Sequence, residues 1–332
     1  MIRVAVVGVN HIGKIHCQAY KRHPAAELAA VCDLMAERAE AAGLLHGVPA
    51  YTDLRELLAA ESIDAVVIAT AGVEKGSHHF EPAMIAMEAG KAVFVEKPIS
   101  NSIEEARHMV AYAKSKDVVL ACNLNHRFTP AARKARELVD AGRLGSLLFL
   151  NMRLTIRNPQ EDTEWLHMRA LHPHSIDVMR YFAGDIRRVQ SFMTKAPGRQ
   201  SWSTVSVNME FASGAVGHLT GSYDMSMRHP IEYCEVAGHE GRLVVDNVYE
   251  SMTYYPHHSD ELTVVRNPLF GGMKGFDDTF EQRIDCFIEE LRAGVKPAHI
   301  TASGADALAA QEVIEAAIQS QQHGGTPVTV PS

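Results

Sequence analysis

The chain has 332 residues, of which 46% are apolar and 22% charged, and its formal net charge at pH 7 is −8. A chain of this length usually forms more than one hydrophobic core, which suggests two domains. The composition excludes a disordered chain. The negative charge and the lack of a Lys/Arg-rich block argue against a nucleic-acid binder.

At the N-terminus, "MIRVAVVG" enters a strand-like run at once, without the charged and apolar regions of a signal peptide. No apolar stretch approaches the roughly 18 residues that span a bilayer. The five cysteines form no C-x-x-C pair; they are Cys17, Cys32, Cys122, Cys234 and Cys286. This usage favours reduced thiols over disulfides or a zinc site. The sequence therefore predicts a cytoplasmic protein that does not bind a membrane.

Residues 2 to about 122 alternate between strand and helix patterns. Strands are expected at "RVAVVGV", "ELAAVCD", "AVVIAT", "AVFVEKP" and "VVLACNL", and helices around 12–22, 36–46, 53–60, 80–89 and 102–115. Two of these helices begin with capping patterns, Asp53-x-x-Glu56 and Ser102-x-x-Glu105. Apolar strands separated by single helices predict an α/β Rossmann domain, a doubly wound parallel sheet, over residues 1–123.

The first strand–helix turn carries "GVNHIG", a G-x-G-x-x-G pattern from Gly8 to Gly13 whose second glycine is replaced by Asn10. That glycine normally lets the backbone approach a pyrophosphate, and asparagine best imitates glycine at positive φ. Asp33 ends the second strand, where a carboxylate can bind both ribose hydroxyls and would repel a 2′-phosphate. We therefore expect NAD in preference to NADP. The alternative is a turn that only packs helix on strand, with Asp33 as a helix cap.

The strand expected at "AVFVEKP" ends in Glu96-Lys97-Pro98. Ligands of an open parallel sheet gather beyond the carboxyl ends of its strands, so this tripeptide should face the cofactor. Pro98 favours an extended Lys97 and so fixes the direction of its side chain. A partly desolvated lysine beside an oxidised nicotinamide has a lowered pKa, which suits it to proton transfer. The alternative is a structural ion pair between Lys97 and Glu96.

Three stretches in this order and spacing, "VAVVGVNHIGKIH", "EAGKAVFVEKP" and "NLNHRFTP", resemble the Gfo/Idh/MocA oxidoreductases, the family of glucose–fructose oxidoreductase and inositol dehydrogenase. The resemblance continues through "HSIDVMRYFAG" and "EVAGHEGRLVVDN" to the end of the chain. It implies a two-domain enzyme that oxidises a secondary alcohol of a sugar, polyol or inositol-like ring with NAD(P). It also implies a C-terminal α+β domain whose open, mainly antiparallel sheet builds homodimers or homotetramers.

Together, the turn motif and the resemblance predict the residues that contact the cofactor. These residues are Gly8, Asn10, His11, Ile12, Gly13, Asp33, Arg38, Thr70, Ala71, His79, Glu96, Lys97 and Asn125. Relatives carry a short loop before the histidine at position 79, whereas "ATAGVEKGSHHF" places it about four residues later. Lengthened loops of this kind reshape a pocket without changing the fold.

From about residue 147 the pattern changes to partly alternating strands. They are "SLLFLNMRLTIR", "VQSFMTK", "TVSVNMEF", "AVGHLTGSY", "IEYCEVAG", "GRLVVDN", "SMTYYP" and "LTVVRN". Turns are expected in "EFASGAV" and "AGHEGRL", and helices around 131–141, 173–183, 279–292 and 303–321. Residues 124–332 are therefore predicted to form a substrate-binding and oligomerisation domain, with a boundary inferred from the change of period near Asn123.

"HPHSIDVMRYFAG" predicts a helix with Pro173 at its first position and Gly184 just past its end. The resemblance implies that His174 is the general base and that a carboxylate four residues earlier orients it, but that position is Ala170. Three interpretations follow. Asp177 or a distant carboxylate partners His174; His172 enters the site and shares a proton relay with Lys97; or the site does not catalyse and His174 only caps its helix.

Arg153 and Trp165, with Arg157, lie on the strand and loop before this helix and could hold a carboxylate or phosphate of the substrate, but we favour the alternative that they are exposed residues of the sheet. Substrate contacts are therefore predicted for Lys97, Arg153, Trp165 and His174. The pairs His78–His79 and His257–His258 lack a third ligand at a sensible spacing, so no metal site is predicted.

The sequence thus predicts an NAD-dependent sugar or polyol dehydrogenase. In it, His174 removes the hydroxyl proton while Lys97 stabilises the developing alkoxide. Two alternatives stay open: a catalytically silent NAD-sensing regulator or scaffold, which Ala170 supports, and an NAD-dependent glycosidase that oxidises its sugar transiently.

Overall fold

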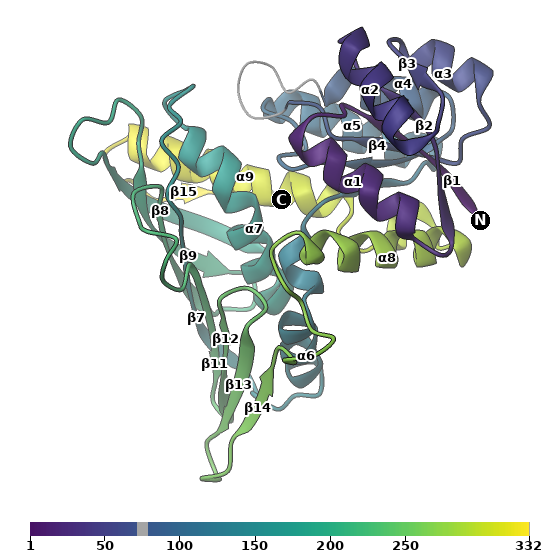
Figure 1. Cartoon of the computed structure of the whole chain (residues 1–332). Helices are drawn as coiled ribbons and strands as arrows, with labels where there is room; N and C mark the ends of the chain where they lie inside the picture. Colours follow the sequence, from purple (N-terminus) through teal and green to yellow (C-terminus); the bar gives the residue numbers. More distant parts are fainter. Residues whose placement is uncertain (72–78, 332) are drawn as a thin grey trace. The chain divides into compact units, whose positions relative to one another are not determined.

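The computed structural model describes residues 1–71 and 79–331, so the predicted loop residues 72–78, including His78, lie outside the described residues. The chain forms two compact units. The first comprises Met1–Leu124 and Phe276–Leu308, and the second Asn125–Gly275 and Ala309–Ser332. Both units are discontinuous in sequence, which the change of period near Asn123 does not indicate. Figure 1 colours the chain by residue number and so separates these segments.

The first unit contains a six-stranded parallel sheet with strand order β3-β2-β1-β4-β5-β6. The strands are β1 (Ile2–Val7), β2 (Ala26–Cys32), β3 (Ala50–Tyr51), β4 (Ala65–Ile68), β5 (Ala92–Val95) and β6 (Leu120–Cys122). The helices are α1 (His11–Arg22), α2 (Ala36–His46), α3 (Leu54–Ala60), α4 (Phe80–Glu88), α5 (Ile103–Lys116), α8 (Asp278–Arg292) and the short η2 (Pro297–His299). This doubly wound order confirms the predicted Rossmann sheet, whose two-residue β3 the sequence pattern missed.

The predicted capping patterns are confirmed at both helix starts. The Asp53 carboxylate accepts hydrogen bonds from the backbone N–H groups of Arg55 and Glu56, and the Ser102 hydroxyl accepts one from Glu105. Such caps satisfy donors that the helix itself leaves without partners. They fix where α3 and α5 begin and so set the lengths of the loops that precede them.

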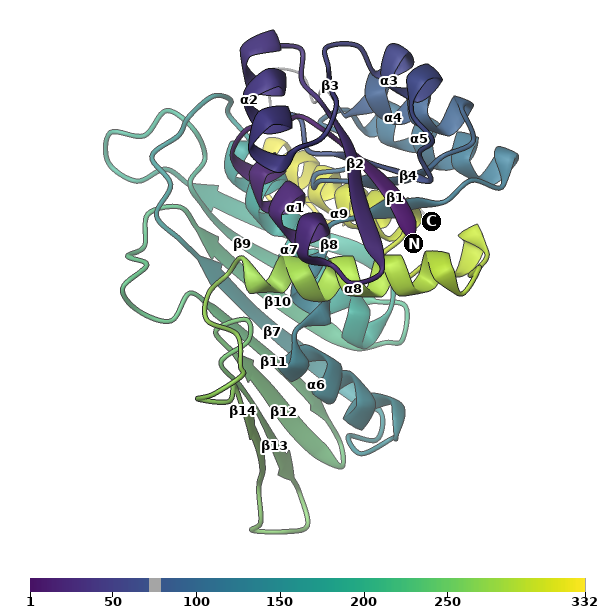
Figure 2. The same cartoon turned by 45° about the vertical axis from the view of Figure 1, so that its right-hand side comes forward.

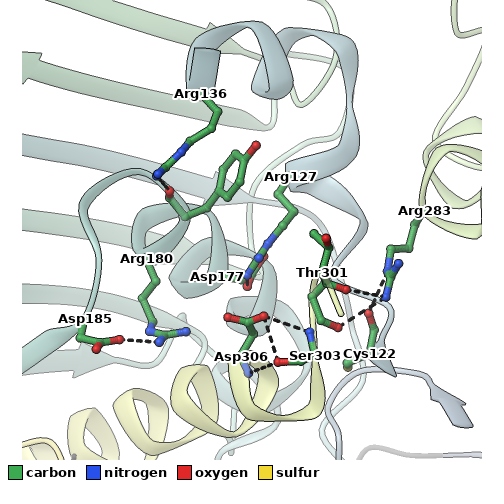
Figure 3. A network of polar contacts seen from close by, with 12 residues as sticks. Cys122, Arg127, Arg136, Asp177, Arg180, Asp185, Arg283, Thr301, Ser303 and Asp306 are labelled. Atoms are coloured by element: carbon green, nitrogen blue, oxygen red, sulfur yellow. Dashed lines mark hydrogen bonds and ion pairs between the residues drawn. The ribbon is translucent and has the colours of Figure 1, made fainter. Parts of the chain in front are cut away.

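Helix α8 comes from the second half of the chain but belongs to the first unit. It contacts α1 and β1, as Figure 2 also shows, and it contributes Phe287 to the same apolar core as Phe94 of β5. The buried guanidinium of Arg283 lies over the Phe94 ring and donates hydrogen bonds to the carbonyl oxygens of Cys122 and Thr301 (Figure 3). These contacts tie residues 276–308 to the strand ends of the Rossmann sheet.

The second unit contains a nine-stranded sheet with strand order β14-β13-β12-β11-β7-β10-β9-β8-β15. The strands are β7 (Leu147–Thr155), β8 (Ile186–Thr194), β9 (Thr204–Phe211), β10 (Val216–Ser222), β11 (Glu232–Gly238), β12 (Gly241–Asp246), β13 (Ser251–Pro256), β14 (Thr263–Arg266) and β15 (Val328–Thr329). The helices are η1 (Asn125–Phe128), α6 (Pro130–Asp140) and α7 (Leu166–Ala183), with most of α9 (Gly304–Gln322), whose first turn belongs to the first unit.

This sheet is mixed and mainly antiparallel, because only β7 and β10 among its described pairs run parallel. The β9–β10 and β11–β12 hairpins confirm the turns predicted in "EFASGAV" and "AGHEGRL". Residues of α6, α7 and α9 share one apolar core with the inward side chains of the strands. In the described part of the chain these helices cover only one face of the sheet, so polar and apolar residues alternate along the strands.

Helix α7 begins earlier than the sequence predicts. It starts at Leu166, seven residues before Pro173, so this proline lies inside the helix and is not its first residue. A proline there lacks the N–H that would bond the preceding turn, which disfavours a helix interior. The buried side chains of Leu166, Met168 and Leu171 anchor that preceding turn, and packing thereby outweighs the local signal. The predicted end is confirmed: Gly184 follows the helix with φ of +80°.

None of the helices in the described residues combines the length and the apolar character that crossing a lipid bilayer requires.

Candidate active site

The turn after β1 depends on two glycines. Gly8 has φ of +86°, and a Cβ atom there would lie 2.6 Å from the backbone nitrogen of Thr70. A Cβ on Gly13 would lie 1.8 Å from the carbonyl oxygen of Gly8, so α1 crosses the turn at a distance that excludes any side chain. The asparagine at position 10 does not use its tolerance of positive φ, because its φ is −84°. Asn10 instead precedes α1 with an exposed side chain, which corrects the glycine-mimic interpretation.

Asp33 is fixed beside this turn. Its buried carboxylate accepts hydrogen bonds from the backbone N–H of Val9 at 3.0 Å and from that of Met35 at 3.0 Å. The carboxylate therefore stands next to the glycine turn, where the ribose of a dinucleotide binds in this type of fold. A turn that a Cβ atom would fill, with a carboxylate held at its side, fits an adenine dinucleotide. Asp33 is not the N-cap of α2, since Met35 holds that position.

The remaining predicted cofactor residues of the first unit lie along the same strand ends. His11 and Ile12 begin α1, exposed Arg38 lies on α2, and Thr70 and Ala71 follow β4. His79 is buried, with Nδ1 2.9 Å from the carbonyl oxygen of Pro98 and Nε2 3.0 Å from that of Thr70. His79 thus links the segment after β4 to the segment after β5.

Glu96 and Lys97 follow β5 and have different surroundings. The Glu96 carboxylate is buried, lies 2.7 Å from His16 Nε2 and accepts a hydrogen bond from the Asn123 amide at 2.7 Å. Burial works against its charged form, but these two partners and the nearby Lys97 hold the pKa of Glu96 below its usual value. The protein itself therefore engages this carboxylate.

Lys97 is half-buried, and its peptide bond to Pro98 is cis. Desolvation lowers the pKa of the Lys97 ammonium, against the opposing effect of the Glu96 carboxylate. Lysines with lowered pKa values exchange protons more readily near neutral pH. The lowered pKa expected of Lys97 is therefore present, and its role in proton transfer stays a prediction.

In the second unit, His174 of α7 has a partner that the sequence did not identify. The ring of His126, from η1, stacks on it with centroids 4.1 Å apart and planes 7° apart. Nδ1 of His126 lies 2.7 Å from the carboxylate of Glu232 at the start of β11. The three side chains are 4%, 5% and 2% exposed for His126, His174 and Glu232. A buried carboxylate is thereby joined to His174 through a second imidazole.

Asp177, predicted as one possible partner of His174, forms a buried ion pair with Arg127 (Figure 3). The guanidinium contacts both carboxylate oxygens, with Nε 2.7 Å from Oδ2. It also lies over the Tyr181 ring, 5.2 Å from its centroid. Asn125, in the same short helix as Arg127, is fully buried. The "NHRF" segment therefore contributes neighbouring residues to the surroundings of α7.

His172 lies in a separate buried cluster on the same helix. Its Nε2 is 3.1 Å from Nε2 of His167, and its Nδ1 is 3.0 Å from the hydroxyl of Ser175. Burial, reinforced by Arg199, lowers the pKa of His167 to about 3, and burial beside His167 lowers that of His172 well below its usual value. Both rings are therefore neutral in the folded protein at neutral pH, and both nitrogens of His172 have partners inside the unit.

The neutral state of this pair predicts a loss of stability in acid. Unfolded histidines titrate near pH 6.5, so the unfolded chain takes up protons below that pH while folded His167 does not until about pH 3. The free energy of unfolding should fall by about 1.4 kcal/mol per pH unit for each such histidine between pH 6 and 4.5. The free energy of unfolding is measured by urea denaturation at several pH values. For His167→Gln it should fall less steeply with decreasing pH, by that amount. The same slope in His167→Gln and wild type would contradict this, and His229→Gln, at an exposed position, is the matched control.

The two other predicted substrate residues, Arg153 and Trp165, each contact an aromatic side chain. Arg153 alternates along β7 with the inward-facing Met152 and Leu154, so its side chain lies on the face of the sheet opposite α7, over the Tyr233 ring. Trp165 precedes α7 and stacks on Trp202. Arg153 is therefore an exposed residue of the sheet, as the alternative interpretation predicts. Among residues 1–71 and 79–331, no three His, Cys, Asp or Glu side chains gather in a metal-binding group.

Sequence reasoning missed His126 and Glu232 as neighbours of His174. His126 stands inside the "NLNHRFTP" stretch that carries the family resemblance, but no pattern in that stretch indicates a role for it. Glu232 shares the inward face of β11 with Cys234 and Val236, both fully buried. A carboxylate on the apolar face of a strand is the one local signal that could have drawn attention to it, because a buried charge requires a partner.

Comparisons with known proteins give one consistent answer. Residues 2–124 match the model of the oxidoreductase family with an NAD-binding Rossmann fold, and residues 132–244 match the GFO/IDH/MocA C-terminal domain. Myo-inositol 2-dehydrogenase of Thermotoga maritima is 27% identical over 90% of both chains, and inositol 2-dehydrogenase of Rhizobium meliloti is 28% identical over 96% of both. A solved levoglucosan dehydrogenase, in complex with NADH and levoglucosan, shares the fold at a TM-score of 0.88 with 22% identity over the whole of both chains. The chain therefore belongs to the Gfo/Idh/MocA oxidoreductase family, and its first unit has that family's NAD-binding Rossmann fold.

Proposed function

We propose that this protein is an NAD-dependent dehydrogenase acting on a secondary alcohol of a sugar, polyol or inositol-like ring. The carboxylate of Asp33, held by Val9 N–H beside the glycine turn, carries the cofactor part of the proposal. Family membership and the two inositol dehydrogenase relatives support the substrate class.

When bound, NAD supplies the hydride acceptor. Asp33 would accept hydrogen bonds from the adenosine ribose hydroxyls, and the N-terminus of α1 beside Gly8 and Gly13 would hold the pyrophosphate. The carboxylate would repel the 2′-phosphate of NADP. Arg38, Thr70, His79 and Asn125 stay predicted cofactor contacts.

His174 is proposed to take the hydroxyl proton as the C–H hydride leaves, which converts the alcohol into a carbonyl. Lys97 is proposed to stabilise the developing alkoxide and to pass the proton on. The lowered pKa of Lys97 supports this role, since an amine poised closer to neutral pH exchanges protons more easily.

We further propose a cytoplasmic homodimer or homotetramer. All five cysteines are thiols and four of them are buried, which suits a reducing compartment. The sheet face opposite α7 carries exposed apolar side chains, Phe192 and Val216 among them, and such a face suits assembly.

The proposal is tested by following NADH absorbance with a panel of inositols, aldoses and sugar lactols. We expect NAD reduction with at least one ring polyol, and a kcat/KM with NAD at least tenfold higher than with NADP. Binding of NAD without reduction by any of the panel would contradict the dehydrogenase and favour a regulator. Release of an aglycone without net NADH would favour a glycosidase instead.

A further inference from the structure

We propose that Glu232 is a positioning residue that acts through His126 on His174. The inference deepens the proposed function, on which its catalytic consequence rests. It concerns the buried contacts Glu232–His126 at 2.7 Å and His126–His174 at 4.1 Å between ring centroids, which join β11, η1 and α7 within the second unit. The helix itself offers His174 no carboxylate one turn earlier, because that residue is Ala170.

Two stacked imidazoles at this distance cannot both carry a proton readily. Positive charges about 4 Å apart in a protein interior repel strongly enough to weaken binding of the second proton by roughly a hundredfold or more. The pair therefore holds one positive charge at most near neutral pH. The position of that charge decides whether His174 can act as a base.

The single charge forms on His174 when the substrate hydroxyl is deprotonated, and the Glu232 carboxylate stabilises it from behind His126. When His126 is neutral, its Nδ1 can only donate a hydrogen bond to the Glu232 carboxylate, which fixes its tautomer and makes its ring face more electron-rich. A proton that arrives on His174 then creates an imidazolium over an electron-rich ring, an arrangement of the cation–π kind, with a negative charge behind it. Glu232 thereby raises the proton affinity of His174 and stabilises the protonated state formed when the substrate hydroxyl is deprotonated.

Among the described residues of the second unit, the charged groups next to this part of α7 are paired with one another or neutral. Arg127 and Asp177 neutralise each other in their ion pair. His172 and His167 stay neutral, because burial lowers their pKa values. The strands packed against α7 present apolar side chains, which are Met152 of β7, Val205 and Val207 of β9 and Leu219 of β10. From α6, Arg136 binds the backbone carbonyl of Tyr181, two turns further along α7.

The first test needs no cofactor and no turnover. Imidazole resonances of the full-length protein are titrated by NMR, and His174 is assigned with a His174→Ala variant. In Glu232→Gln, whose side chain keeps the shape and an acceptor oxygen, the pKa of His174 should fall by about one unit. In Glu232→Asp, which keeps the charge, the pKa of His174 should fall by less. Glu235→Gln is the matched control, because Glu235 lies on the opposite face of β11 and pairs with Arg242.

A double-mutant comparison tests the route through His126. In His126→Asn the pKa of His174 should also fall, because an unpaired buried Glu232 takes up a proton and loses its charge. Adding Glu232→Gln to that variant should then change the pKa of His174 little. If the two substitutions shift the pKa of His174 additively, Glu232 does not act through His126 and the proposal is overturned. If Glu232→Gln does not fold, the pKa of His174 in His126→Asn alone decides whether His126 and Glu232 affect His174.

The second readout is the pH dependence of kcat/KM on a substrate that the wild type oxidises. Loss of the Glu232 charge should move the acid limb to lower pH by about one unit and reduce kcat about tenfold with KM little changed. An acid limb that moves to higher pH would mean that His126 carries the charge in the wild type. No shift in either the NMR titration or the kcat/KM profile would mean that Glu232 has only a structural role. Both outcomes overturn the proposal. If the wild type oxidises no substrate, the proposed function fails, but the NMR titration still decides the role of Glu232.

Discussion

Lys97→Met should reduce kcat by about a thousandfold, because it removes the only group proposed to stabilise the alkoxide while keeping an unbranched side chain of similar length. NADH should still bind within a few-fold of the wild-type affinity, since Asp33 and the glycine turn carry the proposed adenosine and pyrophosphate contacts. The measurements are steady-state turnover and NADH fluorescence titration. Normal turnover in Lys97→Met would remove Lys97 from the mechanism.

Two further variants show why turnover is lost. Lys97→Arg keeps the positive charge but cannot release its proton near neutral pH, so it should restore substrate affinity more than turnover if Lys97 moves a proton. The depressed pKa of Lys97 places any activity limb that it causes below the ordinary lysine value, and Lys97→Arg should lack that limb. Lys91→Met, at the opposite end of β5, should leave kcat unchanged.

The fold was predictable where the signal is local and repeated. Continuous apolar strands between amphipathic helices predict the Rossmann sheet, and the Asp53 and Ser102 caps predict where two helices begin. Two-residue strands carry no period, so β3 and β15 were missed. The start of α7 was misplaced because a proline signal is local, whereas the burial of Leu166 and Met168 is decided by the whole unit.

The residues of the candidate site were likewise predictable only where a local pattern indicates them. Asp33 was predictable because a fixed number of residues separates the glycine turn from the end of the next strand. The pairing of His126 with Glu232 joins residues 106 positions apart, and no spacing rule connects them. The return of residues 276–308 to the first unit has the same origin: the burial of Arg283 and Phe287 depends on a partner sheet that was formed by the start of the chain.

His174→Ala should lower kcat by two to four orders of magnitude, roughly the range that a positioned general base contributes. Its ring is 5% exposed and stacked on His126, so the substitution leaves a ring-sized space against His126. Added imidazole should therefore restore part of the rate in a pH-dependent way, which a purely structural defect would not permit. His218→Ala removes a histidine from strand β10 that is hydrogen-bonded to Asn208 and Thr220, and it should leave kcat unchanged.

The comparison with His172→Asn decides whether His172 or His174 of α7 takes the substrate proton. The pKa of His172 lies well below its usual value, and its nitrogens are hydrogen-bonded to His167 and Ser175, so His172 holds a proton poorly and is unsuited to be the base. We therefore expect His172→Asn to lower thermal stability more than kcat. If His172→Asn instead abolished turnover while His174→Ala kept it, the proton would leave through the buried His172–His167 cluster and not through the imidazole supported by Glu232.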